Sequence, residues 1–174
     1  MLKKKAVVVV VGKQEVEIPH DLRKLCVPID SVKLWKDNPR KNDGAAKKLA
    51  ELIVRNGFRV PIVVDQAGII RAGNTRFKAA KLLGMASIPV IRQTFISEVA
   101  ATAFALSDNK ASEFSQWDDD VLERLMKTEG ITFEETGFDK QDFDMLTKRL
   151  AYNKERELDI LPTEHKCPKC GFEY

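Results

Sequence analysis

A glycine, two polar residues and an arginine stand between a strand-like and a helix-like segment, in the run Ile69-Ile70-Arg71-Ala72-Gly73-Asn74-Thr75-Arg76-Phe77-Lys78-Ala79-Ala80. The first turn of a helix leaves backbone N–H groups unpaired and carries a partial positive charge, and glycine lets an anion approach the backbone. Arg76 falls in that first turn, where its guanidinium can fork onto phosphate oxygens. The pattern predicts an anion site at Gly73–Arg76. The alternative is a tight turn with a solvated arginine.

Two cysteines near the C-terminus have the spacing of a zinc knuckle, in the run His165-Lys166-Cys167-Pro168-Lys169-Cys170-Gly171-Phe172. Thiolates two residues apart suit tetrahedral zinc, which usually takes four ligands. His165 is a candidate third ligand beside Cys167 and Cys170, and Cys26 or a second chain could complete the site. The alternative is a flexible tail without metal. Three cysteines are too few, and odd in number, for a disulfide framework.

Short strands and helices must position these residues. Apolar runs and alternations predict strands over 6–11, 16–18, 26–34, 61–65, 69–71 and 88–91. Apolar residues at helical spacing predict helices over 44–56, 75–83, 98–107, 118–128 and 139–150. Either Asn42 or Asp43 is expected to cap the first of these helices, and Ser97, Asp118 and Asp139 are expected to begin the last three.

The same pattern divides the chain. We expect an N-terminal strand region over 1–20, a phosphate-binding domain over 21–115, a helical extension over 116–152, and a charged linker with the cysteine tail over 153–174. The linker is predicted because residues 153–164 are mostly charged.

The composition is that of a globular protein with a core: 174 residues, 44% hydrophobic and 32% charged. A net charge of +3 permits an anionic partner, whereas a dedicated non-specific DNA binder is more often strongly basic. The apolar run 6–11 is too short for a signal peptide, and no segment approaches the roughly 20 apolar residues that span a bilayer. With so few cysteines, we expect a cytoplasmic protein.

Several landmarks occur in the order and at the spacing of a known domain. They are Asn38-Pro39-Arg40, Gly57-Phe58-x-x-Pro61-Ile62-Val63-Val64 and Ile70-x-Ala72-Gly73-x-x-Arg76-x-x-Ala79-Ala80-x-x-Leu83-Gly84-x-x-x-Ile88-Pro89-Val90-Ile91. Over residues 25–115 the chain resembles the N-terminal domain of ParB-type proteins. The resemblance implies an α+β fold with a mixed sheet related to sulfiredoxin, followed here by a small helical region and the zinc-knuckle-like tail.

The closer resemblance is to ParB-like domains found alone or fused to DNA methyltransferases in phages and mobile elements. It rests on Asp108-Asn109-Lys110, Trp117-Asp118 and Gly137-Phe138. It implies nucleotide or DNA as partner, together with a methyltransferase or another DNA-processing protein, and it allows a homodimer.

The resemblance implies three phosphate-facing segments: Asn38 with Arg40, the loop Gly73-Asn74-Thr75-Arg76, and Asp108 with Asn109. In partition proteins of this family a Glu-Asn pair at the last position helps to hold magnesium and triphosphate. Asp108 and Asn109 are therefore expected magnesium ligands.

Three departures from the family pattern matter. Partition proteins usually have Gly-Glu-Arg-Arg in the loop, and Ser112 stands where they have an arginine after the Asn. These two differences count against cytidine triphosphate binding, and most of all against a DNA-clamp cycle. Asn74 also stands where sulfiredoxin has its reactive cysteine, which excludes peroxiredoxin repair.

Two main functions remain, beside a third option, a structural adaptor whose zinc tail binds another protein. The first is a nucleotide- or DNA-binding module acting in DNA regulation, partition or modification. The alternative is a metal-dependent enzyme of the same superfamily, a nuclease, nucleotide hydrolase or small-molecule kinase, for which Asp108 and Asp65 are the nearby carboxylates. The missing acidic residue in the loop favours binding. Phe114 and Trp117 could stack on bases, although packing in the core is the expected fate.

Overall fold

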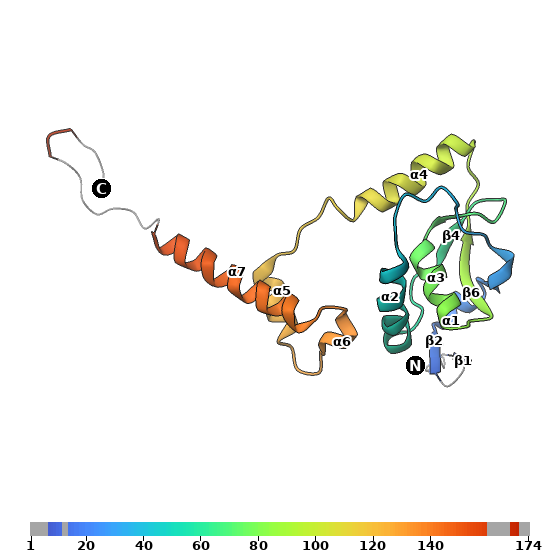
Figure 1. Ribbon diagram of the computed structural model, residues 1–174, viewed down its shortest axis with the longest axis horizontal. Helices are drawn as coiled ribbons and strands as arrows, with labels where there is room; N and C mark the ends of the chain where they lie inside the picture. The colour runs from blue at the N-terminus through green and yellow to red at the C-terminus, as the bar shows by residue number, and fades with distance from the viewer. Residues whose placement is uncertain (1–6, 12–13, 160–167, 171–174) are drawn as a thin grey trace. The chain divides into compact units, whose positions relative to one another are not determined.

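The structure is a computed structural model that describes residues 7–11, 14–159 and 168–170. The chain divides into two compact units (Figure 1). The first comprises the residues up to 116 together with 134–137, and the second comprises 117–133 and the residues from 138 onward. Each unit has its own cluster of buried apolar side chains.

The first unit is built on a four-stranded mixed sheet with the strand order β3–β6–β4–β5. The β3–β6 and β4–β5 pairs are antiparallel and the β4–β6 pair is parallel. A separate antiparallel pair joins β1 to β2. The strand bounds are β1 Val7–Val11, β2 Gln14–Ile18, β3 Cys26–Pro28, β4 Ile62–Val64, β5 Ile70–Ala72 and β6 Ser87–Arg92. The predicted α+β mixed-sheet fold is thus confirmed.

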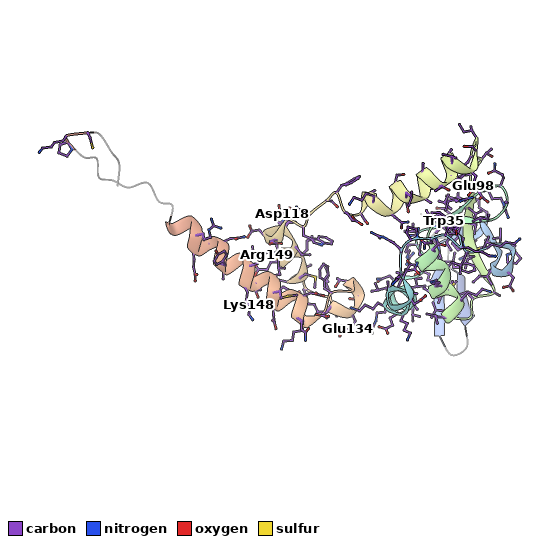
Figure 2. All side chains as sticks on the ribbon, turned by 45° about the horizontal axis from the view of Figure 1, so that its top comes forward. Trp35, Glu98, Asp118, Glu134, Lys148 and Arg149 are labelled. Atoms are coloured by element: carbon purple, nitrogen blue, oxygen red, sulfur yellow. The ribbon has the colours of Figure 1, made fainter. Side chains whose placement is uncertain are left out.

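Helices complete this unit, with bounds α1 His20–Arg23, η1 Ile29–Ser31, α2 Asp43–Asn56, α3 Asn74–Leu82 and α4 Glu98–Ala111. Helices α2 and α3 pack against each other, and α4 packs against β5. Figure 2 labels Trp35 and Glu98 of this unit, and Glu98 lies at the start of α4. The core includes Val16, Ile18, Ile53, Phe58, Ile62, Val64, Ile70, Phe77, Ile88 and Val90.

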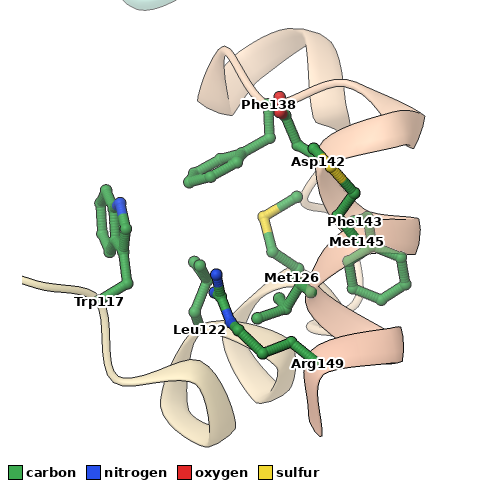
Figure 3. Close-up of a pocket in the computed structure, with 9 residues that line it drawn as sticks. Trp117, Leu122, Met126, Phe138, Asp142, Phe143, Met145 and Arg149 are labelled. Carbon is green, nitrogen blue, oxygen red and sulfur yellow. The ribbon is translucent and has the colours of Figure 1, made fainter. Parts of the chain in front are cut away.

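The remaining helices are α5 Asp119–Met126, α6 Phe133–Thr136 and α7 Lys140–Asp159. Leu122, Leu146 and Leu150 form the core of the second unit. A cavity of about 270 Å³ lies beside that core, lined by Trp117, Leu122, Met126, Phe138, Asp142, Phe143, Met145, Leu146 and Arg149 (Figure 3).

The two aromatic residues expected in the core are exposed. Trp117 is 69% exposed and meets Phe138 edge-on, with 5.5 Å between the ring centroids. Phe114 is 75% exposed. The prediction that they pack inside is therefore wrong.

The predicted helix starts at Ser97, Asp118 and Asp139 are confirmed. The side chains of Ser97 and Asp118 accept hydrogen bonds from the backbone N–H groups of Ala100 and Val121, at 3.1 and 3.0 Å. Asp139 accepts one from the N–H of Asp142 and returns its own N–H to the Asp142 carboxylate. These two reciprocal bonds form a capping box at the start of α7.

Other predicted elements differ from the structure. The strand predicted over 26–34 stops at Pro28, and a 3₁₀ turn follows in which Ser31 Oγ donates to the Pro28 carbonyl at 2.6 Å. The predicted linker is helical as far as Asp159, because charged residues such as Lys, Arg and Glu form helices readily. No helix among the described residues is long and apolar enough to cross a membrane.

Candidate phosphate-binding site

The predicted loop lies between the end of β5 and the start of α3. Gly73 has φ 98°, in the left-handed region that suits glycine. A Cβ placed there would lie 3.1 Å from both Nε and Nη2 of Arg76 and 3.3 Å from Ile62. The Arg76 side chain thus folds back over the glycine, and the loop depends on the absence of a side chain at position 73.

Two helix N-termini meet at this loop. Asn42, the N-cap residue of α2, donates from Nδ2 to Thr75 Oγ1 in the first turn of α3, at 3.1 Å. Asn42 is the N-cap residue of α2 by position, but its side chain makes no cap hydrogen bond. Since each N-terminus carries a partial positive charge, their proximity favours an anion.

Three buried polar atoms at these termini have no hydrogen-bond partner among the described residues. They are Asn42 Oδ1, Asn74 Oδ1 and Arg76 Nε. Asn42 is 5% exposed and Asn74 is 7% exposed. Buried polar atoms in folded proteins nearly always have a partner, so a polar ligand is the natural complement of this group.

Arg76 is half-buried rather than solvated, which removes the simplest alternative to an anion site. Desolvation lowers the pKa of Arg76, and the charge of Asp108 partly offsets this effect. The guanidinium remains protonated at neutral pH, because the side chain of arginine stays charged throughout the physiological pH range. Arg76 also lines a cavity of about 260 Å³ with apolar residues of α2 and the segment after it.

Asn38 and Arg40 lie in the loop that leads to Asn42. Asn38 Oδ1 accepts the N–H of Arg40 at 3.3 Å, and Arg40 Nη2 donates to Glu113 Oε1 at 2.9 Å. Hydrogen bonds from Lys110 and then Arg40 hold the pKa of Glu113 below its ordinary value. Arg40 therefore pairs with the segment after α4, while Asn42 touches the loop.

Asp108 and Asn109 lie in the last turn of α4, with Asp108 exposed and Asn109 half-buried. The described residues contain no group of three or more His, Cys, Asp or Glu side chains arranged as metal ligands. Two oxygen ligands fit magnesium, which commonly takes one or two protein ligands and completes its shell with phosphates and water.

Asp65 is not free to act as a base. Its Oδ1 accepts the N–H groups of Ala67 and Ile69, at 2.9 and 2.8 Å, and its Oδ2 accepts Nε and Nη2 of buried Arg71, at 2.9 and 2.7 Å. Burial raises the pKa of Asp65, but these hydrogen bonds outweigh it and bring the pKa below its ordinary value. Asp65 and Arg71 therefore form a structural pair.

Of the predicted zinc ligands, Cys170 is described and is exposed with a free thiol. His165 and Cys167 lie outside the described residues.

Comparison with known proteins identifies the family of this chain. Residues 13–110, more than half of the chain, match the ParB N-terminal domain. The probable chromosome-partitioning protein ParB of Rickettsia felis is 28% identical over 145 residues, covering 80% of this chain and 45% of that protein. The corresponding protein of Rickettsia typhi is 35% identical over 86 residues, covering 48% of this chain and 30% of that protein. The chain thus spans less than half the length of these relatives.

Among solved structures, the chain is similar to the C-terminally truncated chromosome-partitioning protein ParB from Caulobacter crescentus complexed with CTP-gamma-S. The TM-score is 0.59 at 20% identity, over 78% of this chain and 86% of that chain. At this identity the likeness concerns the fold. With the match over residues 13–110, the chain belongs to the ParB N-terminal domain family.

Proposed function

We propose that this domain binds a nucleoside triphosphate at the loop Gly73–Arg76 and acts in DNA partition or another DNA transaction. The observation that carries the proposal is a set of three buried atoms beside the starts of α2 and α3, Asn42 Oδ1, Asn74 Oδ1 and Arg76 Nε, for which the described part of the chain offers no hydrogen-bond partner.

These atoms suit a nucleotide better than a bare anion. Arg76 Nε is a donor and matches a phosphate oxygen. The two asparagine carbonyl oxygens are acceptors, to which a fully ionised phosphate group has no hydrogen to give. Sugar hydroxyls and base amino groups do have one. A ligand that carries both phosphates and such donors satisfies all three atoms.

Cytidine triphosphate is the first nucleotide to test, because the Caulobacter crescentus structure is complexed with CTP-gamma-S. Asn74 and Thr75 stand where partition proteins usually have Glu and Arg, so the affinity is expected to be weaker than theirs. Magnesium would be held by Asp108 and Asn109 and would screen the phosphate charge. The rest of its shell is left to phosphates and water.

The arrangement supports binding more than turnover. Rate acceleration needs groups that act more strongly in the transition state than in the ground state. Asp65 is fully engaged, and Asp108 is the remaining carboxylate of the two considered from the sequence. A nuclease, nucleotide hydrolase or small-molecule kinase is the alternative function.

Calorimetric titration with each nucleoside triphosphate and with pyrophosphate, with and without magnesium, tests the proposal. Arg76→Ala should weaken CTP binding at least about tenfold, since a hydrogen bond to a charged group contributes about 1.5–3 kcal/mol. Arg55→Ala is the matched control, because Arg55 is exposed in the last turn of α2.

Equal affinity of the Arg76→Ala variant and the parent would overturn the site. Pyrophosphate binding as tightly as CTP would reduce the site to a bare anion site. Rapid hydrolysis that disappears in Asp108→Ala would make the enzyme the better assignment.

Two further expectations accompany this function. We expect zinc to be bound by Cys167 and Cys170, with His165 as third ligand, at one ion per chain or one per two chains. Elemental analysis of protein prepared without chelator measures the zinc content. DNA as partner is checked by a gel shift run beside the titrations. The relatives named above are partition proteins, so a methyltransferase partner stays a prediction, as does a homodimer.

A further inference from the structure

Arg71 is a charged side chain in the interior of the first unit. It lies in β5, two residues before Gly73, and its side chain has no exposed surface. A buried charge is costly unless it is paired and hydrogen-bonded. Nη2 of Arg71 is paired with two carboxylates, Asp65 at 2.7 Å and Glu98 at 2.6 Å, whereas its buried Nη1 has no hydrogen-bond partner among the described residues.

The two carboxylates differ in what they connect. Asp65 is buried and also holds the turn between β4 and β5 through the N–H groups of Ala67 and Ile69. Glu98 is 70% exposed at its side chain and lies in the first turn of α4. The Arg71–Glu98 bond is therefore the one that reaches from the sheet to the helix.

The segment that enters α4 is fastened at the same place. Gln66, next to Asp65, donates from Nε2 to the carbonyl of Phe95 at 3.0 Å and accepts the N–H of Phe95 at 3.3 Å. Farther along, α4 buries two small side chains, Ala101 and Ala105. These contacts lie before α4 or within its first eight residues.

The other end of α4 carries the expected magnesium ligands. Asp108 follows Glu98 by ten residues, which is about 15 Å along a helix axis. A tilt of about 4° at the base of a helix this long displaces that point by about 1 Å. Asp108 is near enough to Arg76 for its charge to act on the guanidinium. A change in the direction of α4 would therefore move Asp108 relative to the rest of the unit.

We propose that Arg71 is a positioning residue for the nucleotide site. Through Glu98 it fixes the base of α4 on the sheet, and so it holds Asp108 and Asn109 opposite Arg76. This proposal rests on the proposed function, because it assigns Asp108 and Asn109 to the magnesium-bound triphosphate.

Glu98→Gln is the sharpest test, because it removes the charge that reaches α4 and leaves the buried Asp65–Arg71 pair in place. Two measurements on the full chain are needed. One is hydrogen exchange of the α4 amides without nucleotide. The other is the dissociation constant of CTP with and without magnesium. Glu17→Gln is the matched control, since it breaks an exposed pair with Arg59 elsewhere in the same unit.

We expect Glu98→Gln to speed exchange over residues 101–111 while β4 and β5 keep their protection. CTP affinity in magnesium should fall at least about fivefold, the lower end of typical coupling between linked sites. Affinity without magnesium should change less. A residue that merely stabilises the fold would lower protection throughout the unit and leave the magnesium dependence unchanged.

Unchanged α4 exchange in Glu98→Gln overturns the proposal, and so does faster exchange with unchanged CTP affinity in magnesium. Either result, obtained while Arg76→Ala still weakens CTP binding, refutes the positioning role and leaves the proposed function standing. A parent protein that binds no nucleotide, or an Arg76→Ala variant that binds like the parent, refutes the proposed function and with it this inference.

Discussion

At the scale of single residues, the site depends on backbone conformation as much as on side-chain charge. Gly73 holds φ 98°, and Arg76 covers the space where a Cβ would stand. Asn42 and Asn74 present buried acceptors. The loop is therefore a fixed surface of N–H donors, carbonyl acceptors and one guanidinium, each tied to a particular residue.

Gly73→Ala should damage both stability and binding. A non-glycine residue in the left-handed region costs about 1–2 kcal/mol, and the new methyl group pushes on Arg76 and Ile62. Urea unfolding and CTP titration measure the two effects. Gly44→Ala in the first turn of α2 is the control. Nothing lies within 4 Å of its added Cβ, and alanine there should be neutral or stabilising. A Gly73→Ala variant as stable as the parent would contradict the strained loop.

The Asp65–Arg71 pair predicts a pH dependence of stability. A carboxyl whose pKa is lower in the folded than in the unfolded chain adds stability above the unfolded value, which is lost as the pH falls through the folded pKa. The pKa of Asp65 lies below its ordinary 3.8, because hydrogen bonds from Ile69 and Arg71 outweigh the effect of burial. The free energy of unfolding of the parent should therefore fall below about pH 4.

Asp65→Asn should remove this acid-dependent part and lower stability at neutral pH by about 3 kcal/mol, since Arg71 loses a buried partner. Urea unfolding across the acid range measures both, with Asp37→Asn as a control at an exposed carboxylate. Equal pH profiles of the parent and Asp65→Asn would show that the pair does not govern acid stability.

Sequence reasoning found the loop but missed two residues that support it. Gly73 and Arg76 stand out because a glycine before a helix and an arginine in its first turn together form the pattern of an anion site. Arg71 sits in a strand, where arginine is usually exposed at the surface. Its burial depends on Asp65, which a hairpin turn brings beside it. Asn42 looks like a helix cap, and its bond to Thr75 exists because α2 and α3 pack together.

At the scale of elements, the helix starts were predictable, and so was the end of α2 at Asn56, whereas the ends of α4 and α7 were not. Side chains that cap a helix act within three residues, so Ser97 and Asp118 identify their helices from the local sequence. Ends depend on what the next residues pack against. Helix α4 continues to Ala111 and α7 to Asp159, through residues that could equally form a loop. Pro28 ends β3 because its ring fixes the backbone and it has no N–H to donate.

The short helix α5 should depend on its cap. Asp118→Ala removes the acceptor for the Val121 N–H, and the loss of such a cap costs about 1 kcal/mol. Asp120→Ala, in the first turn of the same helix, removes an equal charge without a cap bond and should have a smaller effect. Hydrogen exchange over residues 119–126 compares the two variants. Equal protection in both would show that charge at the helix start, rather than capping, stabilises α5.

At the scale of the whole molecule, the chain has two cores of unequal size. The match to the ParB N-terminal domain covers 13–110, which lies in the first unit with its mixed sheet. The second unit rests on three leucines, with Met126, Phe138 and Phe143 packed against them. Buried apolar area drives folding, so the first unit should be the more stable of the two.

Separate cores predict separate responses to a core substitution. Leu150 is 6% exposed and sits in the small core, so Leu150→Ala should cost about 2–5 kcal/mol and loosen the second unit. We expect faster hydrogen exchange in α5 and α7, with unchanged exchange in β4, β5 and β6 and unchanged CTP affinity. Met145→Ala, in the same helix but 61% exposed, is the control and should have little effect. If Leu150→Ala lowered protection in β4–β6 as much as in α7, the two units would unfold together. A substitution in one core lowers protection in another core only when both cores unfold in the same cooperative transition.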